Sequence, residues 1–565
     1  MGLSVVDGAV EPIARGSGLH PDLVRMALCL IGSYPLCAVL KRLPDSRRQL
    51  KDVYIIGIAL FYLVGVFSLW AGLRTLLISI GVTYATTKYL RGNPFMPWIV
   101  FLFVMGHLFT SHIEAQWYQV DYEASLSDIT GAQMVLCMKL TAFAWNVHDG
   151  TLADNLLSDF QKERRVKEQP KLLDFLAYCL FFPSLLTGPS YDYREFEQWI
   201  DLSMFDVTTA EERRKRKNRA IPRSGRVASR KLVEGLLWIG LWTQSANYIY
   251  TEYAQSSKFM SHLFVVRVVY LYLLGFTYRL KYYGAWTISE GACILSGLGF
   301  NGRDKNGKYR WDRVKNVSPW RIETAQNTYV YLGAWNMNTS AWLKNYVYLR
   351  VTPRGRKPGF RSTLSTFVTS ALWHGTRPGY YLTFVTGAFY QSLGKLFRRN
   401  LRPIFMRPDG TPGPYKPYYD AVCLVVTQLS FGYICHPFVL LDLAASLDMW
   451  KTVYFFVHVV IAVVLFLFHG PFKKSVTGYL KSLQPKPLKP SDQVKSDTQR
   501  LKEMRKEIEQ LSAPAALGVP NPDFEHFDDD LQEAISEFEQ LKEDLSVEIQ
   551  NLKKYQQQQR TKKND

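Results

Sequence analysis

One histidine and two nearby asparagines are the side chains best suited to acid–base chemistry in this sequence. His374 lies in the segment STLSTFVTSALWHGTRPGYY, where small and apolar residues precede it and Pro378 follows. A neutral imidazole can accept a proton from a hydroxyl, because its unperturbed pKa of about 6.5 is close to physiological pH. The local sequence equally allows a buried histidine with a structural hydrogen bond, which is the role we favour for His107, His112, His148 and His458 in or beside other apolar stretches.

The asparagines lie upstream, in the segment WNMNTSAWLKNY. An asparagine amide can polarise a carbonyl without changing its charge. If Trp335 to Tyr346 is helical, Asn336 and Asn338 project about 200° apart, so only one of them can face the same space as His374. We predict Asn336, which would share a small-residue face with Ser340 and Leu343.

Two sequences in this region match N-glycosylation sequons, Asn316-Val-Ser and Asn338-Thr-Ser. The basic run RVTPRGRK follows the second one closely. We therefore predict a cytosolic, unglycosylated Asn338.

The elements that must position these residues are long apolar blocks. A membrane span needs roughly 20 mostly apolar residues. Twelve apolar blocks, some of them shorter than this, predict an all-α polytopic membrane protein with about eleven transmembrane or re-entrant helices. The blocks are 23–40, 53–84 (two elements hinged near Gly72), 97–110, 134–145, 172–186, 232–249, 263–278, 286–300, 367–373, 380–393, 418–441 and 453–468.

The charge distribution orients these blocks. The chain has a formal net charge of +19, and the excess positive charge lies before residue 471, in short connections such as the basic segment 211–231. Basic connections of this kind are typical of cytosolic loops, so we do not expect a nucleic-acid partner. An odd number of crossings with a cytosolic C-terminus divides the chain into a lumenal segment 1–20, a transmembrane catalytic domain 21–470 and a cytosolic tail 471–565.

The tail begins with a Pro/Lys-rich hinge, and residues 530–559 have apolar positions at helical spacing. This pattern is typical of a short amphipathic helix or weak coiled coil, and it fits a solvated tail equally well. Lys562 and Lys563 lie at the third and fourth positions from the end of the sequence. They match a dilysine retrieval signal, which predicts an endoplasmic reticulum membrane protein.

Cysteine and histidine spacing indicates neither disulfides nor a metal. The seven cysteines lie in apolar stretches without a CxxC pair, and the histidines lack carboxylate or thiolate partners at ligand spacing. No serine or cysteine lies in a nucleophile motif such as GxSxG, so we expect no acyl-enzyme intermediate.

Together these segments carry a family resemblance. The pairing of WNMNTSAWLKNYVYLR with SALWHGTRPGYY resembles the membrane-bound O-acyltransferase superfamily. Two further segments, FFPSLLTGPSYDYREF (181–196) and KYYGAWTISEGACILSGLGFNG (281–302), are similar to its lysophospholipid acyltransferase branch, in particular the broad-specificity fungal enzymes. The resemblance covers about residues 20–470.

The resemblance implies a helical fold around a chamber, in which His374 and Asn336 (Asn338 as the alternative) are catalytic. It also implies acyl-CoA as a co-substrate from the cytosol, a lysophospholipid from the bilayer as acceptor, and no permanently bound cofactor. Further residues would then line or brace the chamber and bind substrate: Trp335, Trp373, Tyr283, Glu290, Tyr191 and Arg194.

Cytosolic basic residues near the asparagine motif are candidates for the coenzyme A phosphates, although membrane anchoring explains any one of them equally well. They are Lys305, Lys308, Arg310, Arg313, Lys344, Arg350, Arg354 and Arg356.

Two other classes of function stay open at this point. Another branch of the superfamily would acylate a sterol, a diacylglycerol or a protein. A transporter would show paired inverted repeats, which we do not find in the sequence. The acceptor head group and acyl chain are not determined, and a homo-oligomer is possible.

Overall fold

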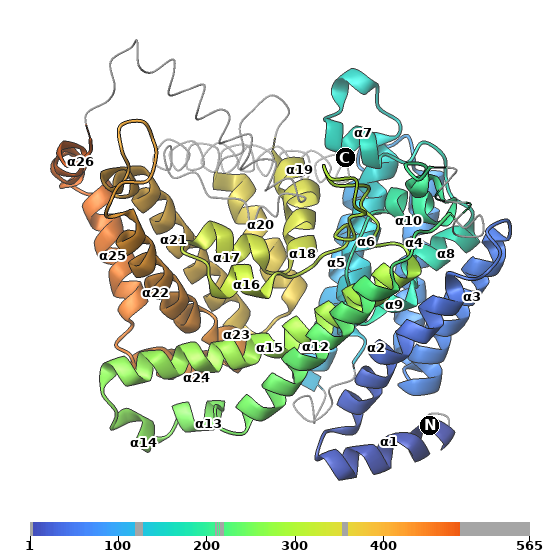
Figure 1. Ribbon diagram of the computed structural model, residues 1–565, viewed down its shortest axis with the longest axis horizontal. Helices are drawn as coiled ribbons and strands as arrows, with labels where there is room; N and C mark the ends of the chain where they lie inside the picture. Colours follow the sequence, from blue (N-terminus) through green and yellow to red (C-terminus); the bar gives the residue numbers. More distant parts are fainter. Residues whose placement is uncertain are drawn as a thin grey trace, which may run out of the picture.

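The computed structural model describes residues 4–118, 128–209, 212, 214, 220–352 and 360–485, and within these ranges helices are joined by loops without a β-strand. The all-α prediction is confirmed. Figure 1 shows the arrangement of these helices.

The first part of the chain forms a group of helices that lie together at one side of Figure 1. They are α1 (Ser4–Ser17), α2 (Pro21–Leu40), α3 (Arg48–Leu60) with the π-helix η1 (Phe61–Val66), α4 (Trp70–Tyr89), α5 (Met96–Ile113) with the π-helix η2 (Glu114–Tyr118), α6 (Thr130–Asp149), α7 (Asp159–Arg164), α8 (Leu172–Cys179), α9 (Phe182–Leu185) and α10 (Tyr193–Ile200). The predicted hinge near Gly72 lies a few residues earlier, between η1 and α4.

Two long helices connect this group to the rest of the molecule. The helices α12 (Gly225–Ala246) and α15 (Phe264–Ser296) pack along each other, and α15 also contacts α2 at one side and α22 at the other. The sequence predicted two elements, 263–278 and 286–300, where the structure has the single 33-residue α15. The polar residues between those blocks continue the helix because they are covered by tertiary contacts. The last part of the basic segment 211–231 forms the start of α12, from Gly225 onward.

The second part of the chain forms the other group of helices. They are α16 (Pro319–Glu323), α17 (Thr328–Ala334), α18 (Met337–Trp342), the π-helix η5 (Leu343–Tyr348), α19 (Leu349–Val351), α20 (Phe360–His374), α21 (Pro378–Asn400), α22 (Lys416–Ile434), α23 (His436–Leu440), α24 (Leu443–Lys451), α25 (Phe456–His469) and α26 (Lys473–Ser482). Short helices α13 (Thr251–Ala254) and α14 (Ser257–Met260) lie before α15.

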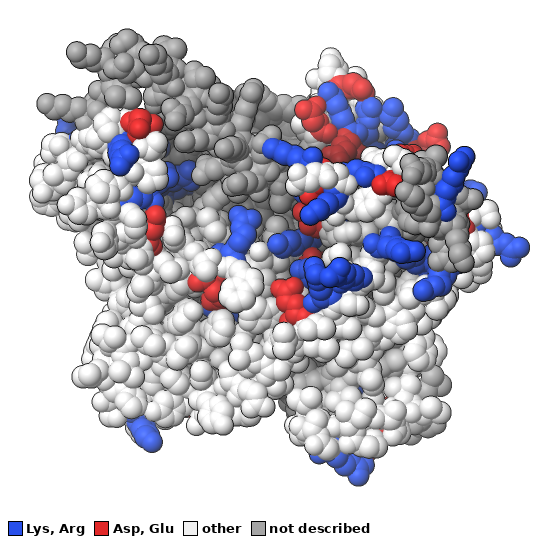
Figure 2. Space-filling model, in the orientation of Figure 1, with Lys and Arg blue, Asp and Glu red and all other residues white. Residues whose placement is uncertain are grey.

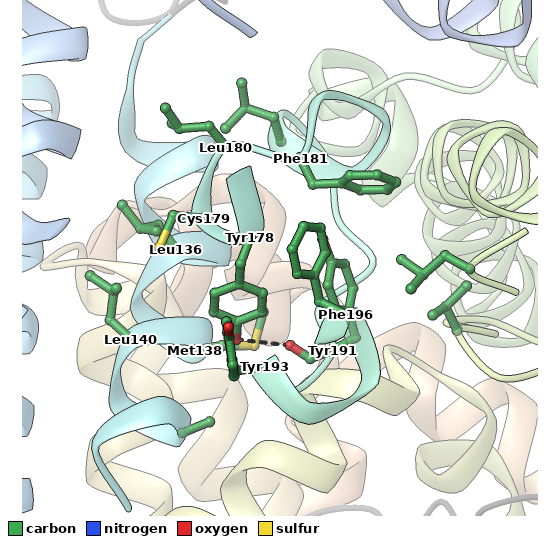
Figure 3. Packing of buried hydrophobic residues seen from close by; sticks show 14 of the residues in the cluster. Leu136, Met138, Leu140, Tyr178, Cys179, Leu180, Phe181, Tyr191, Tyr193 and Phe196 are labelled. Carbon is green, nitrogen blue, oxygen red and sulfur yellow. Dashed lines mark hydrogen bonds between the residues drawn. The ribbon is translucent and has the colours of Figure 1, made fainter. Parts of the chain in front are cut away.

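Two hydrophobic cores correspond to these groups. The larger core is centred on α6, most of whose side chains are buried. Figure 3 shows its aromatic part, where Tyr178, Phe181 and Phe196 pack beside Leu136, Met138 and Leu140 of α6. The second core joins α15 to α21–α25. Trp342 and Trp373 belong to the first core while Trp335 packs on the second, so the asparagine motif lies at the junction between them.

Fewer helices than the predicted eleven are both long and apolar enough to cross a membrane. Within the described residues four qualify, namely Pro21–Leu40, Arg48–Val66, Met96–Tyr118 and Lys416–Leu440. The bent pair α24 and α25, with 78° between its two helices, makes up to five. Many of the other elements are too short, as α20 is with 15 residues. The count of eleven is therefore not confirmed.

The surface is divided by charge. In Figure 2 most acidic and basic side chains lie in the upper half of the view, the lower half is largely uncharged, and basic side chains reappear at the lower edge. An uncharged zone with charged borders is the pattern expected for a membrane protein.

Candidate active site

His374 is the last residue of α20, and its imidazole is held in one tautomer. Nδ1 lies 2.7 Å from the backbone oxygen of Ser370, one turn earlier in the same helix. Because a carbonyl can only accept, Nδ1 carries the proton and Nε2 of the neutral ring carries the free lone pair. Nε2 makes no hydrogen bond to the described residues, so it is available as a proton acceptor.

The surroundings of His374 are aromatic and apolar. The ring centroids of Trp373, Phe384 and Phe438 lie 4.7, 4.9 and 5.1 Å from that of the imidazole, and Tyr380 lies at 5.8 Å. Such walls fix the ring orientation and favour the neutral imidazole. Trp373 itself is buried and donates from Nε1 to the Met134 oxygen at 3.0 Å, so it orients the segment before His374.

Asn336 lies immediately before α18, whereas the sequence predicted it inside a helix. Its backbone is left-handed, with φ 42° and ψ 57°, a conformation that asparagine tolerates better than most residues. Its Oδ1 accepts the hydroxyl of Thr339 at 2.9 Å. This bond turns the carbonyl side of the amide toward α18 and leaves the NH2 group without a hydrogen-bond partner among the described residues.

Asn338 has a different environment. Its backbone N–H donates to Asn316 Oδ1, and its side-chain Nδ2 is buried without a partner in the described part of the chain. Because α18 begins only at Met337, Asn336 is the N-cap of this helix, and its backbone oxygen accepts the N–H of Ser340 at 3.0 Å. The two asparagines differ because one precedes the helix and the other is part of its first turn.

Helix α6 brings the histidine and asparagine segments together. Met134 accepts the Trp373 indole, Met138 Sδ lies 3.3 Å from the Thr339 hydroxyl, and Thr141 accepts the Trp342 indole at 2.9 Å. Met134 and Thr141 are about 10 Å apart along an α-helix. The indoles of Trp342 and Trp373 are also neighbours, with centroids 6.1 Å apart. The segments that carry His374 and Asn336 are therefore neighbours on one face of the core.

Trp335 and Tyr283 connect the asparagine segment to α15. Trp335 lies in an aromatic group with Trp286 at 5.0 Å and Tyr283 at 6.0 Å between ring centroids. The buried Tyr283 donates its hydroxyl to Glu323 at 2.6 Å, and Arg279 binds the same carboxylate. The ring of Tyr283 therefore packs against Trp335, while the Tyr283 hydroxyl is bound to the Arg279–Glu323 ion pair.

Glu290 is also on α15, buried to 2% exposure. One carboxylate oxygen lies 3.4 Å from Lys231 on α12, and the other has no hydrogen-bond partner in the described residues. This arrangement stabilises the α12–α15 pair, and the remaining oxygen retains its capacity to accept a hydrogen bond.

Tyr191 and Arg194 lie in different environments. Tyr191 is buried in the core of Figure 3, where its hydroxyl is 3.1 Å from the buried Lys139 ammonium group. Arg194 pairs with Glu197 on the same helix and is partly exposed. Neither residue contacts His374 or Asn336 in a described interaction, so the structure gives them supporting positions in the scaffold.

The candidate phosphate-binding residues divide into engaged and available groups. Arg310 pairs with Asp312, Arg313 with Glu195, and Arg350 with Asp149. Burial opposes ionisation of Asp312, yet hydrogen bonds from Arg310 and Asn301 hold the pKa of Asp312 below its ordinary value.

The two available residues are Lys308, which is exposed, and Lys344 on η5, which is half-buried. Neither side chain has an ion pair with a described residue. Lys305 is exposed in the same loop as Lys308. Arg354 and Arg356 lie outside the described residues.

A polar network that no sequence motif indicated supports η5. Arg350 binds the fully buried Asp149 through two bonds of 2.7 and 2.6 Å, and Tyr346 donates to Asp192 at 2.8 Å. The partners are some 150 to 200 positions apart, so no spacing in the sequence could indicate them. In the described parts of the chain, no group of three or more potential metal ligands comes together.

Comparison with known proteins identifies the class to which this helical chain belongs. The model of the membrane-bound O-acyltransferase family matches residues 115–436, more than half of the sequence, so the chain belongs to this family.

Individual relatives narrow the comparison. The chain is 48% identical to a lysophospholipid acyltransferase of Saccharomyces cerevisiae, covering 92% of this chain and 84% of the relative. It is 41% identical to a lysophospholipid acyltransferase of Schizosaccharomyces pombe, covering 93% and 99%. A human relative, membrane-bound glycerophospholipid O-acyltransferase 2, is 29% identical over 82% of this chain and 88% of its own length.

Proposed function

We propose that this protein is an acyl-CoA-dependent lysophospholipid acyltransferase, which esterifies the free glycerol hydroxyl of a lysophospholipid, usually at sn-2. The observation that carries the proposal is the fixed tautomer of His374, whose Nδ1–H is bound to Ser370 and whose Nε2 has no hydrogen-bond partner among the described residues. The names of the relatives in two yeasts and in human support the acceptor class.

In the proposed reaction, Nε2 of His374 accepts the proton of the lysophospholipid hydroxyl as the oxygen attacks the thioester carbonyl. The NH2 group of Asn336 donates a hydrogen bond to the carbonyl oxygen, which becomes negatively charged in the transition state. The attack forms a tetrahedral intermediate, and its collapse breaks the carbon–sulfur bond. The coenzyme A thiolate then takes the proton from His374, so the products are phospholipid and free coenzyme A.

The bulky aromatic groups around His374 have a defined role in this scheme. They exclude water from the imidazole, which limits hydrolysis of the thioester as a side reaction. Lys308 and Lys344 have charge available for the coenzyme A phosphates, whereas Arg310, Arg313 and Arg350 are already neutralised by acidic partners.

We place the enzyme in the endoplasmic reticulum membrane with a cytosolic C-terminal tail. The dilysine-like Lys562-Lys563 sequence and the basic segment 211–231 support this orientation. The tail beyond residue 485 lies outside the described residues.

The test is an acyl-transfer assay on purified protein, with a panel of lysophospholipids and labelled acyl-CoA. We expect ester formation with at least one lysophospholipid, and a loss of roughly 10²- to 10⁴-fold in the His374→Ala variant because general-base catalysis is removed. Acyl-CoA binding and the melting temperature should be retained.

His458→Asn is a suitable control, since His458 is held between Tyr433 and Thr386 in another helix. Transfer to a sterol or diacylglycerol but to no lysophospholipid would contradict the acceptor class. Normal turnover by His374→Ala would remove the histidine from the mechanism.

A further inference from the structure

The chain on both sides of His374 is held by residues of α5 and η2. On one side, Nε2 of His112 is 3.1 Å from the backbone oxygen of Trp373. On the other side, Gln116 Oε1 accepts two hydrogen bonds of 2.9 Å from Thr376, one from its backbone N–H and one from its hydroxyl. Both His112 and Gln116 are only 2% exposed. The residue between these contacts is the proposed base.

A second set of contacts surrounds Gln116. Trp117 donates from Nε1 to the Thr376 hydroxyl at 2.6 Å. Arg377 donates to the backbone oxygen of Gln116, and its guanidinium group lies 4.5 Å from the Trp117 ring centroid. The Thr376 hydroxyl thus donates one bond and accepts another. We call Gln116, Trp117, Thr376 and Arg377, together with His112, the histidine clamp.

The packing at Gly375 shows how close this clamp lies to His374. Gly375 has φ +139°, and a Cβ atom added there would be 2.3 Å from Gln116 Nε2. That separation is far below a normal van der Waals contact. The Gln116 amide therefore packs directly against the residue that follows His374, at a position where only glycine has room.

The histidine clamp contacts the C-terminal end of α20, where the helix lacks some of its backbone hydrogen bonds. His374 ends α20, and the last four carbonyl groups of any helix lack partners within it. Here Ala371 O accepts the N–H of Gly375, and His112 binds the Trp373 oxygen. Without such partners the last turn would fray, and Nε2 of His374 would lose its fixed direction.

The local form of η2 assists this arrangement. Residues Glu114 to Tyr118 form a π-helix that continues α5. Short π-helices inside or at the end of α-helices occur frequently at functional sites. Here the widened turn presents two consecutive side chains, Gln116 and Trp117, to the same hydroxyl of Thr376.

We propose that Gln116, assisted by His112, is a positioning residue for acyl transfer: it holds the backbone around His374 so that Nε2 points at the acceptor hydroxyl. This inference rests on the proposed role of His374 as the base. Gln116 acts through His374 and does not itself receive the proton.

The experiment compares Gln116→Met with wild-type enzyme in the acyl-transfer assay. Methionine matches the size of glutamine but cannot accept the two hydrogen bonds from Thr376. We expect kcat to fall roughly 10- to 100-fold, because displacement of a catalytic group by about 1 Å has an effect of this order. The KM values for acyl-CoA and lysophospholipid should change less than about twofold, since binding is not affected.

Gln428→Met is the matched control. Gln428 is also buried and hydrogen-bonded, through Nε2 to the Ile322 oxygen at 2.7 Å, but it lies on α22. The Gln428→Met variant should lower the melting temperature about as much as Gln116→Met does, while leaving kcat unchanged. Equal losses of kcat in the two variants, or a wild-type kcat in folded Gln116→Met, would overturn the proposal.

A second pair of variants tests the clamp independently if Gln116→Met does not fold. Thr376→Ser keeps the hydroxyl and should retain near-normal kcat, whereas Thr376→Val should lose several-fold. If Thr376→Ser and Thr376→Val are both normal, the clamp proposal is wrong.

His374→Ala in the same series separates the two hypotheses. An active His374→Ala enzyme contradicts the proposed function itself. An inactive His374→Ala enzyme beside a normal Gln116→Met enzyme contradicts only the clamp. In the double variant Gln116→Met/His374→Ala, any residual rate should equal that of His374→Ala alone, because Gln116 acts through the histidine.

Discussion

Asn316 Oδ1 accepts the backbone N–H of Asn338 at 3.2 Å, although the two residues are 22 positions apart. The backbone oxygen of Asn316 also accepts the N–H of Met337 at 2.8 Å. One residue therefore satisfies the first two N–H groups of α18. This cap fixes the start of the helix and leaves Asn336 just outside it, in the left-handed conformation that presents its amide.

The two asparagines of the motif should differ sharply in kinetics. We expect Asn336→Ala to lower kcat roughly 10²- to 10³-fold, as removal of a single oxyanion donor does. Asn338→Ala should cost several-fold less, because its Nδ2 has no partner within the described part of the chain and its backbone N–H is unaffected. The measurement is kcat at saturating acyl-CoA and lysophospholipid.

Asn336→Gly separates the amide from the backbone effect. Glycine adopts φ 42° without strain, so this variant should fold as well as wild type and still lose the same activity as Asn336→Ala. A larger loss of kcat at position 338 than at 336 would show that Asn338, and not Asn336, supplies the catalytic amide.

The sequon at Asn316 should carry no glycan. Asn316 is only 4% exposed, and its amide is occupied by the cap of α18. Endoglycosidase treatment should therefore change the electrophoretic mobility of the wild type no more than that of the Asn316→Ala variant. Asn316→Ala should reduce stability by about 1 kcal/mol, as loss of a helix cap does. Asn316→Asp keeps the acceptor oxygen and should be milder, and equal effects of the two would argue against the cap.

Lys344 and Arg350 should respond differently to removal, although both are basic residues near the asparagine motif. Lys344→Ala should raise the KM for acyl-CoA by about tenfold, since a hydrogen bond to a charged group contributes about 1.5–3 kcal/mol. The KM for lysophospholipid should stay constant. The control is Lys481→Ala on α26, which should change neither constant.

Arg350→Ala should instead destabilise the protein by about 3–5 kcal/mol, because it leaves the fully buried Asp149 without its ion-pair partner. Thermal unfolding in detergent measures this loss. Arg350→Lys should rescue poorly, since one ammonium group cannot replace two parallel bonds. A stable Arg350→Ala enzyme with a raised KM for acyl-CoA would instead assign Arg350 to coenzyme A.

The tail provides a test of orientation. A tag after Asp565 should be accessible from the cytosol in selectively permeabilised cells. Changing Lys562 and Lys563 to serine should let part of the protein leave the endoplasmic reticulum, because the retrieval receptor no longer recognises the ending. A tag protected in the lumen would reverse the orientation and move acyl-CoA entry to the other side.

The sequence by itself determined the helical class and the apolar blocks. These follow from local properties, since hydropathy and residue type are written in consecutive positions. The prediction that His374 is the base came instead from the family resemblance. The sequence failed where burial by distant partners changes a local preference. α15 continues as one helix through the polar segment that suggested two, because Tyr283 and Glu290 find their partners on other elements.

Only the tertiary structure decided how the site is built. The left-handed turn at Asn336 depends on Asn316, the anchoring of both motifs depends on α6, and the support of His374 depends on Gln116, some 260 positions earlier. Arg350 is a phosphate-binding candidate by sequence, and only the structure places it beside Asp149. Hydrogen bonds and ion pairs of this kind act over about 3 Å in space, and spacing along the chain carries no record of which distant groups folding brings into that range.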